Sequence, residues 1–314
     1  MYKNFFRLRE NPFNVNPDPR YIFPTAAMQS ALAGLTYGIE TRKGFLLLTG
    51  EVGTGKTTLL NRLLDWLRER RVATAFVFNT RITTSQLFDF ILNDFEIPCD
   101  SRMKSQAVMR LNQWLLERYR AGQTAVIIVD EAQNLSFEVL EEIRLLTNLE
   151  TSQEKLLQIV LSGQPELDEK LQAPQLRQLL QRITLRLKTT PLTLEEMHGY
   201  ILERLRIAGA TGDPIFSPEA MDAVHRHSRG IPRVANLVCE HALITAYVEN
   251  QRPVLVAHVD EASHEYHFDR LEPTVAPRPF AEPRRTTASD ALLTQLLDRL
   301  RDEVRAKESG GDKP

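Results

Sequence analysis

The stretch Phe45-Leu-Leu-Leu-Thr-Gly-Glu-Val-Gly-Thr-Gly-Lys-Thr57 decides the fold of this chain. Its apolar start predicts a buried strand, and residues 58–67 after it have the apolar spacing of an amphipathic helix. Between them lies the pattern G-x-x-x-x-G-K-[ST], in which backbone N–H groups and the positive helix end bind phosphate. We therefore expect a phosphate-binding loop with contacts from Gly50, Glu51, Val52, Gly53, Thr54, Gly55, Lys56, Thr57 and Thr58.

Two side chains of this loop have distinct tasks. Lys56 is placed to reach the β- and γ-phosphates of a nucleoside triphosphate, and the Thr57 hydroxyl is an oxygen ligand of the kind that Mg²⁺ binds. A glycine-rich turn without a ligand is the alternative, and the flanking strand and helix make it the weaker one. The loop therefore predicts binding of a nucleoside triphosphate together with Mg²⁺.

A second, acidic motif follows the apolar run at residues 125–129, which predicts a central strand. Asp130 and Glu131 come directly after it, where two unpaired carboxylates would cost free energy unless a metal ion and water share the crevice. We expect Asp130 to hold the Mg²⁺ and Glu131 to orient and polarise the attacking water. The alternative is an acidic pair that caps the helix from Ser136 onward. Together the two motifs predict a protein that binds and hydrolyses a nucleoside triphosphate.

Short β-rich runs alternate with amphipathic stretches between residues 44 and 188. This alternation is typical of βαβ units and of a parallel sheet that is covered by helices on both faces. The predicted fold is therefore an α/β P-loop NTPase core with a five-stranded parallel sheet, followed by an α-helical domain. The strands are expected at 45–48, 75–78, 126–129, 157–161 and 183–187, and the intervening helices at 59–67, 86–95, 108–119 and 137–149.

Composition divides the chain into five parts. An N-terminal segment and helix, 1–43, precede the nucleotide-binding core at 44–190, and helical patterns predict a lid domain at 191–269. Prolines among polar residues indicate a linker at 270–289, and leucines at helical spacing predict an amphipathic helix and tail at 290–314. A docking helix, a coiled-coil seam and an unpartnered helix remain open for this last part.

The composition excludes several classes of protein. With 314 residues, 42% hydrophobic and 25% charged residues, and a net charge of −2, the chain fits neither a disordered protein nor a polyelectrolyte binder. The two cysteines, Cys99 and Cys239, lack the spacing of metal ligands. No apolar run reaches the roughly 20 residues of a membrane helix, and the N-terminus has no signal-peptide core. We expect a cytoplasmic protein without a membrane span.

Several strings resemble the AAA+ ATPases of the ExeA family, also called general secretion pathway protein A. The resemblance covers about residues 1–268, the ATPase region of that family, and implies ATP as the nucleotide and Mg²⁺ as its metal. The strings that carry it include Asp130-Glu-Ala-Gln-Asn-Leu135, Gly163-Gln-Pro-Glu-Leu167, Gln181-Arg-Ile183 and Gly230-Ile-Pro-Arg-Val-Ala-Asn236.

The resemblance also implies roles for residues outside the two motifs. Gln164 falls at the place of the polar sensor for the γ-phosphate and the water, with Ser162 as the second choice. Arg182 falls at the place of the arginine finger that reaches a neighbouring subunit's nucleotide, with Arg177 as the alternative. Arg233 resembles the second sensor, which the lid carries over the nucleotide. Each residue also has an interpretation without a catalytic role. Gln164 would then be a loop amide, Arg182 and Arg177 surface arginines, and Arg233 a helix-capping arginine.

An arginine finger that acts between subunits makes hydrolysis depend on head-to-tail assembly, so a homo-oligomeric ring or filament is expected. By resemblance, the ATP cycle drives assembly of a protein partner in secretion, envelope or exopolysaccharide machinery, peripheral to the inner membrane. A DNA-associated helper like the transposition ATPases of the TniB kind is one alternative, and a nucleotide-switched scaffold with little turnover is another. DNA is less favoured because residues 177–252 hold 10 Lys/Arg against 8 Asp/Glu.

Overall fold

The computed structural model describes residues 2–14, 18–78, 81–99 and 103–265. The chain separates into two compact units, residues 1–269 and 270–314, and the second lies outside the described residues. The linker predicted at 270–289 and the helix predicted at 290–314 therefore lie there too. Within the described ranges, no helix is both long and apolar enough to cross a membrane.

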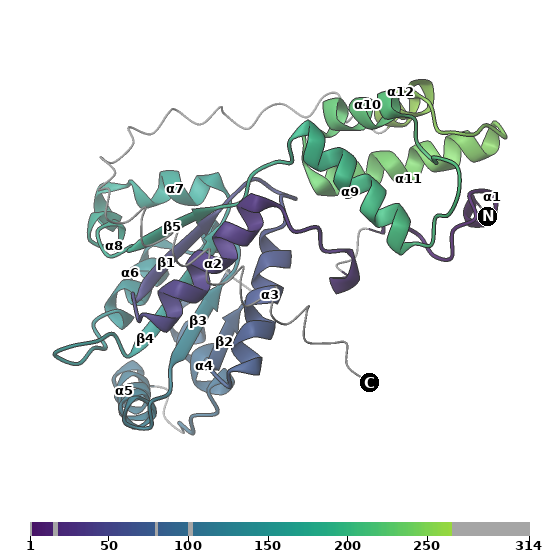
Figure 1. The fold of residues 1–314 in the computed structure, drawn as a ribbon. Coiled ribbons are helices and arrows are strands. Elements are labelled where there is room, and N and C mark those ends of the chain that lie inside the picture. The colour runs from purple at the N-terminus through teal and green to yellow at the C-terminus, as the bar shows by residue number, and fades with distance from the viewer. Residues whose placement is uncertain (1, 15–17, 79–80, 100–102, 266–314) are drawn as a thin grey trace, which may run out of the picture. The chain divides into compact units, whose positions relative to one another are not determined.

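Five parallel strands form one sheet in the first unit, among the helices α2–α8 (Figure 1). Their order is β2-β3-β4-β1-β5, and each neighbouring pair is parallel. The predicted five-stranded α/β fold is thus confirmed. Because parallel strands end at the same edge, the loops after β1, β3 and β4 lie next to one another. The strands are β1 (Phe45–Thr49), β2 (Ala73–Val77), β3 (Ala125–Val129), β4 (Leu157–Gly163) and β5 (Leu185–Lys188).

Helices cover both faces of the sheet, and alternate strand residues point into two separate cores. Leu46, Leu48 and Ile128 pack against α2 (Ala26–Glu40) and α3 (Lys56–Glu69). Their neighbours Leu47 and Val129 belong to the larger core on the other face. That face is covered by α4 (Thr84–Asp94), α5 (Lys104–Arg120), α6 (Phe137–Leu146), α7 (Pro165–Leu171) and α8 (Arg177–Leu180).

Four further helices form a separate core in the same unit. They are α9 (Leu194–Ile207), α10 (Pro218–Ser228), α11 (Pro232–Val248) and α12 (Val256–Glu265). The helical patterns of the sequence predict helices at 193–208, 217–228 and 232–248, which α9, α10 and α11 confirm, but they do not predict α12. The capping box of Thr193 with Glu196 begins α9, and Ser217 with Pro218 begins α10.

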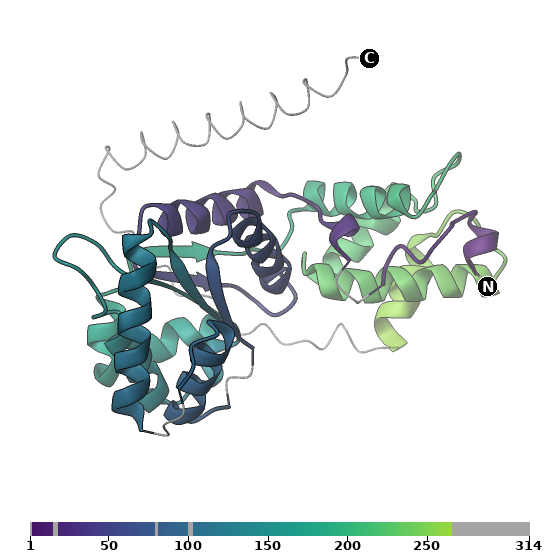
Figure 2. The ribbon, with the colours of Figure 1, turned by 90° about the horizontal axis from the view of Figure 1, so that it is seen from below.

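The N-terminal segment packs on these four helices. Phe6, Leu8 and Phe13 are buried in their core, and helix α1 (Tyr2–Phe5) lies beside α11 (Figure 2). The Tyr2 hydroxyl donates to the Glu240 carboxylate of α11, at 2.9 and 3.0 Å from its two oxygens. The segment therefore shares its core with the helical part, although it lies at the opposite end of the sequence.

Candidate active site

The phosphate-binding loop lies between β1 and α3, as its motif predicts. Gly53 and Gly55 have φ values of 81° and 96°, the left-handed region that favours glycine. Gly50 packs so closely under the chain after β5 that an added Cβ would lie 2.0 Å from Thr189 Oγ1. Larger residues at these positions would therefore distort the loop.

Lys56 is the first residue of α3, and its side chain folds back over the loop. Its Nζ donates to the carbonyl oxygens of Gly50, at 2.7 Å, and Glu51, at 2.9 Å. Only 5% of the residue is exposed. Burial lowers the pKa of Lys56, while the charges of Glu131 and Asp130 act in the opposite direction. The ammonium group thus lies beside the loop where phosphate would bind, in a site that disfavours its charge.

Asp130 lies at the end of β3, directly across from the loop. Thr57 Oγ1 lies 3.5 Å from one carboxylate oxygen, and the other accepts from Ser162 Oγ at 2.8 Å and from the Glu131 N–H at 3.0 Å. The residue is 7% exposed. A nearly buried carboxylate that faces a threonine hydroxyl is a donor set suited to Mg²⁺. Thr57 and Asp130 therefore fit the predicted metal site.

Glu131 follows in a left-handed conformation, with φ of 51° and ψ of 37°. Two side-chain amides donate to its Oε2: Gln133 Nε2 at 2.5 Å and Gln164 Nε2 at 3.0 Å. A non-glycine residue with positive φ is uncommon and is often found at functional sites. The structure thus brings the predicted sensor, Gln164, to the predicted catalytic carboxylate.

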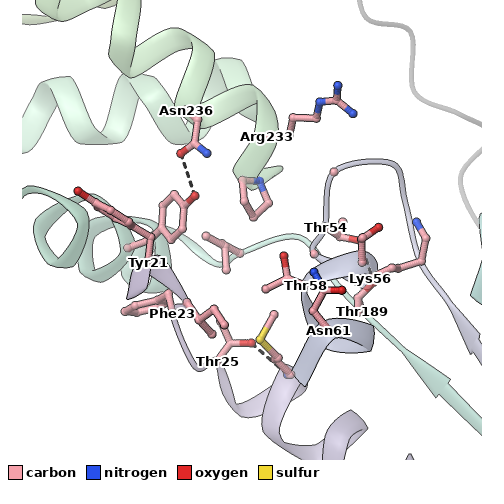
Figure 3. Close-up of a pocket in the computed structure, with 18 of the residues that line it drawn as sticks. Tyr21, Phe23, Thr25, Thr54, Lys56, Thr58, Asn61, Thr189, Arg233 and Asn236 are labelled. Carbon is pink, nitrogen blue, oxygen red and sulfur yellow. Dashed lines mark hydrogen bonds between the residues drawn. The ribbon is translucent and has the colours of Figure 1, made fainter. Parts of the chain in front are cut away.

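A cavity of about 540 Å³ opens beside the loop (Figure 3). Glu131 and residues of the loop line it, together with Asn61 and Asp65 of α3. The chain from β5 to α9, the helices α9 and α11, and the segment before α2 form the rest. Neutral and aromatic side chains line this pocket together with charged ones, a lining that suits a nucleotide. These neutral side chains include Ile22, Phe23, Met28, Leu192, Tyr200, Pro232 and Asn236.

The three predicted arginines occupy different places. Arg233 lines the cavity at the start of α11, and its N–H donates to the Gly53 carbonyl at 3.4 Å. Its guanidinium extends away from Thr58 and Asn61 in Figure 3. Arg182 and Arg177 do not line this cavity, and Arg182 Nη1 donates to Thr147 Oγ1 at 2.5 Å. The structure therefore brings Arg233 to the pocket, whereas Arg182 and Arg177 lie away from it.

Several residues of the site were not singled out from the sequence. The N-terminal segment contributes Tyr21 and Phe23, and the helical part contributes Tyr200, Arg204 and Asn236. The sequence does not predict that these residues share a pocket, because they come from segments that are far apart in the chain. For Gln133 the sequence offers a weak signal, because it lies two residues after the predicted catalytic residue Glu131.

The parallel sheet, the phosphate-binding loop and the helical part together define a P-loop fold of the AAA+ class. The family described as "AAA domain" matches residues 39–171. Over 275 residues the chain is 43% identical to general secretion pathway protein A of Aeromonas hydrophila, a match that covers 87% of this chain and 50% of that protein. The similarity to general secretion pathway protein A and the match to the AAA domain bear out the resemblance found in the motifs. It spans about half the length of that relative.

Solved structures support the fold alone. The Cdc6p structure from Pyrobaculum aerophilum has a TM-score of 0.61 and 16% identity, with 82% of this chain and 71% of that chain covered. The ORC2 protein of Aeropyrum pernix, solved as ADPNP–ADP complexes, has a TM-score of 0.58 and 17% identity over the same shares. At these identities the likeness concerns the arrangement of the sheet and helices.

Proposed function

We propose that this chain binds ATP with Mg²⁺ in the described cavity and hydrolyses it. The observation that carries the proposal is the convergence of Lys56, Asp130 and Glu131 at the edge where β1 and β3 end. The adjoining cavity has the size and lining for the nucleoside. The loop N–H groups and Lys56 would bind the phosphates, and Arg233 would approach from the lid.

Each acidic residue has its own part in this proposal. Asp130 and Thr57 would hold Mg²⁺, which when bound supplies positive charge beside the β- and γ-phosphates. Glu131 would accept a hydrogen bond from the attacking water, aim its oxygen at the γ-phosphorus and take up its proton. Gln164 would bridge the water and the γ-phosphate. These groups perform the positioning and charge stabilisation on which phosphoryl transfer depends.

We further propose that hydrolysis takes place between subunits of a homo-oligomer. Arg182 and Arg177 lie outside the lining of their own chain's cavity, which is compatible with a task at a neighbour's nucleotide. Head-to-tail contacts of this kind produce a ring or a filament. A steep rise in specific activity with protein concentration would support the assembly, and a constant specific activity would speak against it.

The kinship with general secretion pathway protein A supports a role in secretion. We propose that the ATP cycle drives assembly of a protein complex in secretion, envelope or exopolysaccharide machinery, on the cytoplasmic side of the inner membrane. A pull-down that compares the full chain with one truncated before Glu272 tests whether residues 272–314 recruit that complex. Loss of specific partners on truncation is expected, and identical sets of partners would contradict this part.

Phosphate release from ATP tests the enzymatic proposal. The wild-type chain should release phosphate only with Mg²⁺, and Lys56→Ala should abolish it because the γ-phosphate loses its cation. Lys43→Ala, which changes an exposed lysine, is the matched control. Duplex DNA, added across a salt series, should leave the rate unchanged. Activation by DNA would favour the DNA-helper alternative, and release that Lys56→Ala does not reduce would contradict hydrolysis at this site.

A further inference from the structure

The carboxylate of Glu131 is held by a second amide that the proposed mechanism does not use. Gln133, in the short 3-10 turn Ala132–Asn134, donates from Nε2 to Glu131 Oε2 at 2.5 Å. Gln164 donates to the same oxygen from the end of β4, at 3.0 Å. The two donors come from different loops, so hydrogen bonds from two segments hold the carboxylate in place.

The orientation of the Gln133 amide follows from its other partner. Its Oε1 accepts the backbone N–H of Gln164 at 3.2 Å. A backbone N–H can only donate, so the oxygen of the amide must face it and the NH₂ group must face Glu131. The amide therefore bridges the two loops in one direction, with Gln164 N–H as donor at one end and the Glu131 carboxylate as acceptor at the other.

The surroundings of Gln133 restrict its movement. A Cβ on Gly163 would lie 2.8 Å from Gln133 Oε1, so the glycine leaves just enough room for this amide. Lys170 Nζ, from α7, donates to the carbonyl oxygen of Gln133 at 2.9 Å and also to that of Leu135. The turn that carries Gln133 is thus fastened to α7, and its side chain to the end of β4.

We propose that Gln133 is a positioning residue for Glu131, an inference that rests on the proposed ATP hydrolysis. In the structure the side-chain amide of Gln164 donates to Glu131, yet the proposed sensor role requires the same amide to bind the γ-phosphate. If Gln164 Nε2 turns to a phosphate oxygen, Gln133 Nε2 is the donor that keeps the carboxylate aimed at the water. Gln133 is not among the residues that line the cavity, and it acts through its hydrogen bond to Glu131.

Two substitutions separate the bridging role from simple packing. Gln133→Glu keeps an oxygen for the Gln164 N–H but places a second carboxylate against Glu131. Gln133→Met keeps the length of the side chain and removes both hydrogen bonds. Gln172→Glu, an exposed residue that caps the end of α7, introduces the same charge nearby and is the control. For each full-length variant, kcat, ATP affinity and melting temperature are measured with Mg²⁺ present.

We expect kcat to fall about tenfold to a hundredfold in Gln133→Glu and less in Gln133→Met, because a displaced catalytic group costs up to roughly a hundredfold in rate. ATP affinity and melting temperature should match those of Gln172→Glu. An unchanged kcat in both variants would overturn the inference, as would a fall in kcat matched by an equal loss of affinity or of folded protein. Absence of hydrolysis in the wild-type chain would instead overturn the proposed function.

Discussion

At the scale of single residues, the hydroxyl of Ser162 orients the proposed metal ligand. It is fully buried and donates to Asp130 at 2.8 Å, so it fixes which carboxylate oxygen remains for the metal and Thr57. Outer groups of this kind tune metal affinity. The sequence offered Ser162 only as the second choice for the sensor, and its contact is with Asp130 rather than with Glu131.

Ser162→Ala should weaken the response to Mg²⁺. Because Asp130 loses one of its donors, we expect the Mg²⁺ concentration for half-maximal ATPase activity to rise roughly tenfold. A magnesium titration at saturating ATP measures it. Ser263→Ala is the control, since Ser263 Oγ is buried in α12 and has no hydrogen-bond partner among the described residues. An unshifted titration for Ser162→Ala would show that this contact does not influence the metal.

The buried charge of Lys56 should cost stability. Lys56→Met removes an ammonium group whose pKa is lowered by burial. We therefore expect the nucleotide-free variant to melt roughly 2–4 °C higher at neutral pH, the shift that a gain of about 1 kcal/mol in stability produces in a domain of this size. Melting curves of this variant and of the exposed Lys3→Met give the comparison. A lower melting temperature for Lys56→Met would show that its contacts with the loop outweigh its desolvation.

The difference in stability between Lys56→Met and the wild-type chain should depend on pH in one direction. The pKa of Lys56 is lower in the folded chain than the ordinary value of 10.5, so above the folded-state pKa the unfolded chain binds more protons. Stability of the wild-type chain at this site therefore rises with pH in that range. The advantage of Lys56→Met should be greatest at neutral pH and should shrink as pH approaches 10.5. A gap that widens with pH would contradict the assignment.

At the scale of elements, Arg204 of α9 joins the N-terminal segment to the helical part. Its guanidinium donates to the carbonyl oxygens of Pro12, at 2.6 Å, and Asn14, at 3.3 Å, and to the Tyr200 hydroxyl at 3.1 Å. It also lies over the ring of Tyr21, with 4.6 Å from guanidinium carbon to ring centroid. These contacts set one wall of the cavity, because the joined segment lines it.

Arg204→Met should loosen this wall. We expect a loss of about 2–4 kcal/mol in the free energy of unfolding, since buried partners lose charged hydrogen bonds, and weaker ATP binding. Denaturant unfolding and nucleotide titration measure the two effects. Arg206→Met is the matched control on the same helix, where the arginine is exposed and pairs only with Glu203 among the described residues. Equal behaviour of the two variants would refute the anchoring role.

Local sequence patterns predicted the elements that carry the phosphate site. The strand–loop–helix at 45–67 and the strand that ends at Asp130 depend on periodicity and on short-range geometry. The predicted helix at 137–149 ends earlier, at Leu146, where the Thr147 hydroxyl donates to the Arg144 carbonyl. End positions depend on such caps, which periodicity does not detect.

The nucleoside end of the pocket could not be predicted in this way. Phe6, Leu8 and Phe13 have no regular spacing, and the core that they share is formed by residues between 192 and 262, far along the chain. In the sequence Arg204 resembles an ordinary charged residue on a helix. Its hydrogen bond to the Pro12 carbonyl is evident only in the structure. Contacts across such distances follow from the packing of whole elements.

At the scale of the whole molecule, the account requires cooperation between subunits. Arg182→Ala and Lys56→Ala should each be inactive alone, the first for lack of a finger and the second for lack of phosphate binding. Mixed together they should regain activity, because a subunit with an intact cavity can receive Arg182 from its neighbour. Arg177→Ala, tested in the same way, covers the alternative. A mixture as inactive as its components would contradict the intersubunit site.

The proposed hydrolysis depends on Glu131, which would activate water for attack on ATP bound at the phosphate loop. Glu131→Gln keeps the size of the side chain and removes the carboxylate. Single-turnover phosphate release, with protein in excess of ATP and with Mg²⁺ present, measures the effect. We expect undiminished ATP binding and a rate at least about a hundredfold lower than that of the wild-type chain. Equal rates for the two proteins would contradict it.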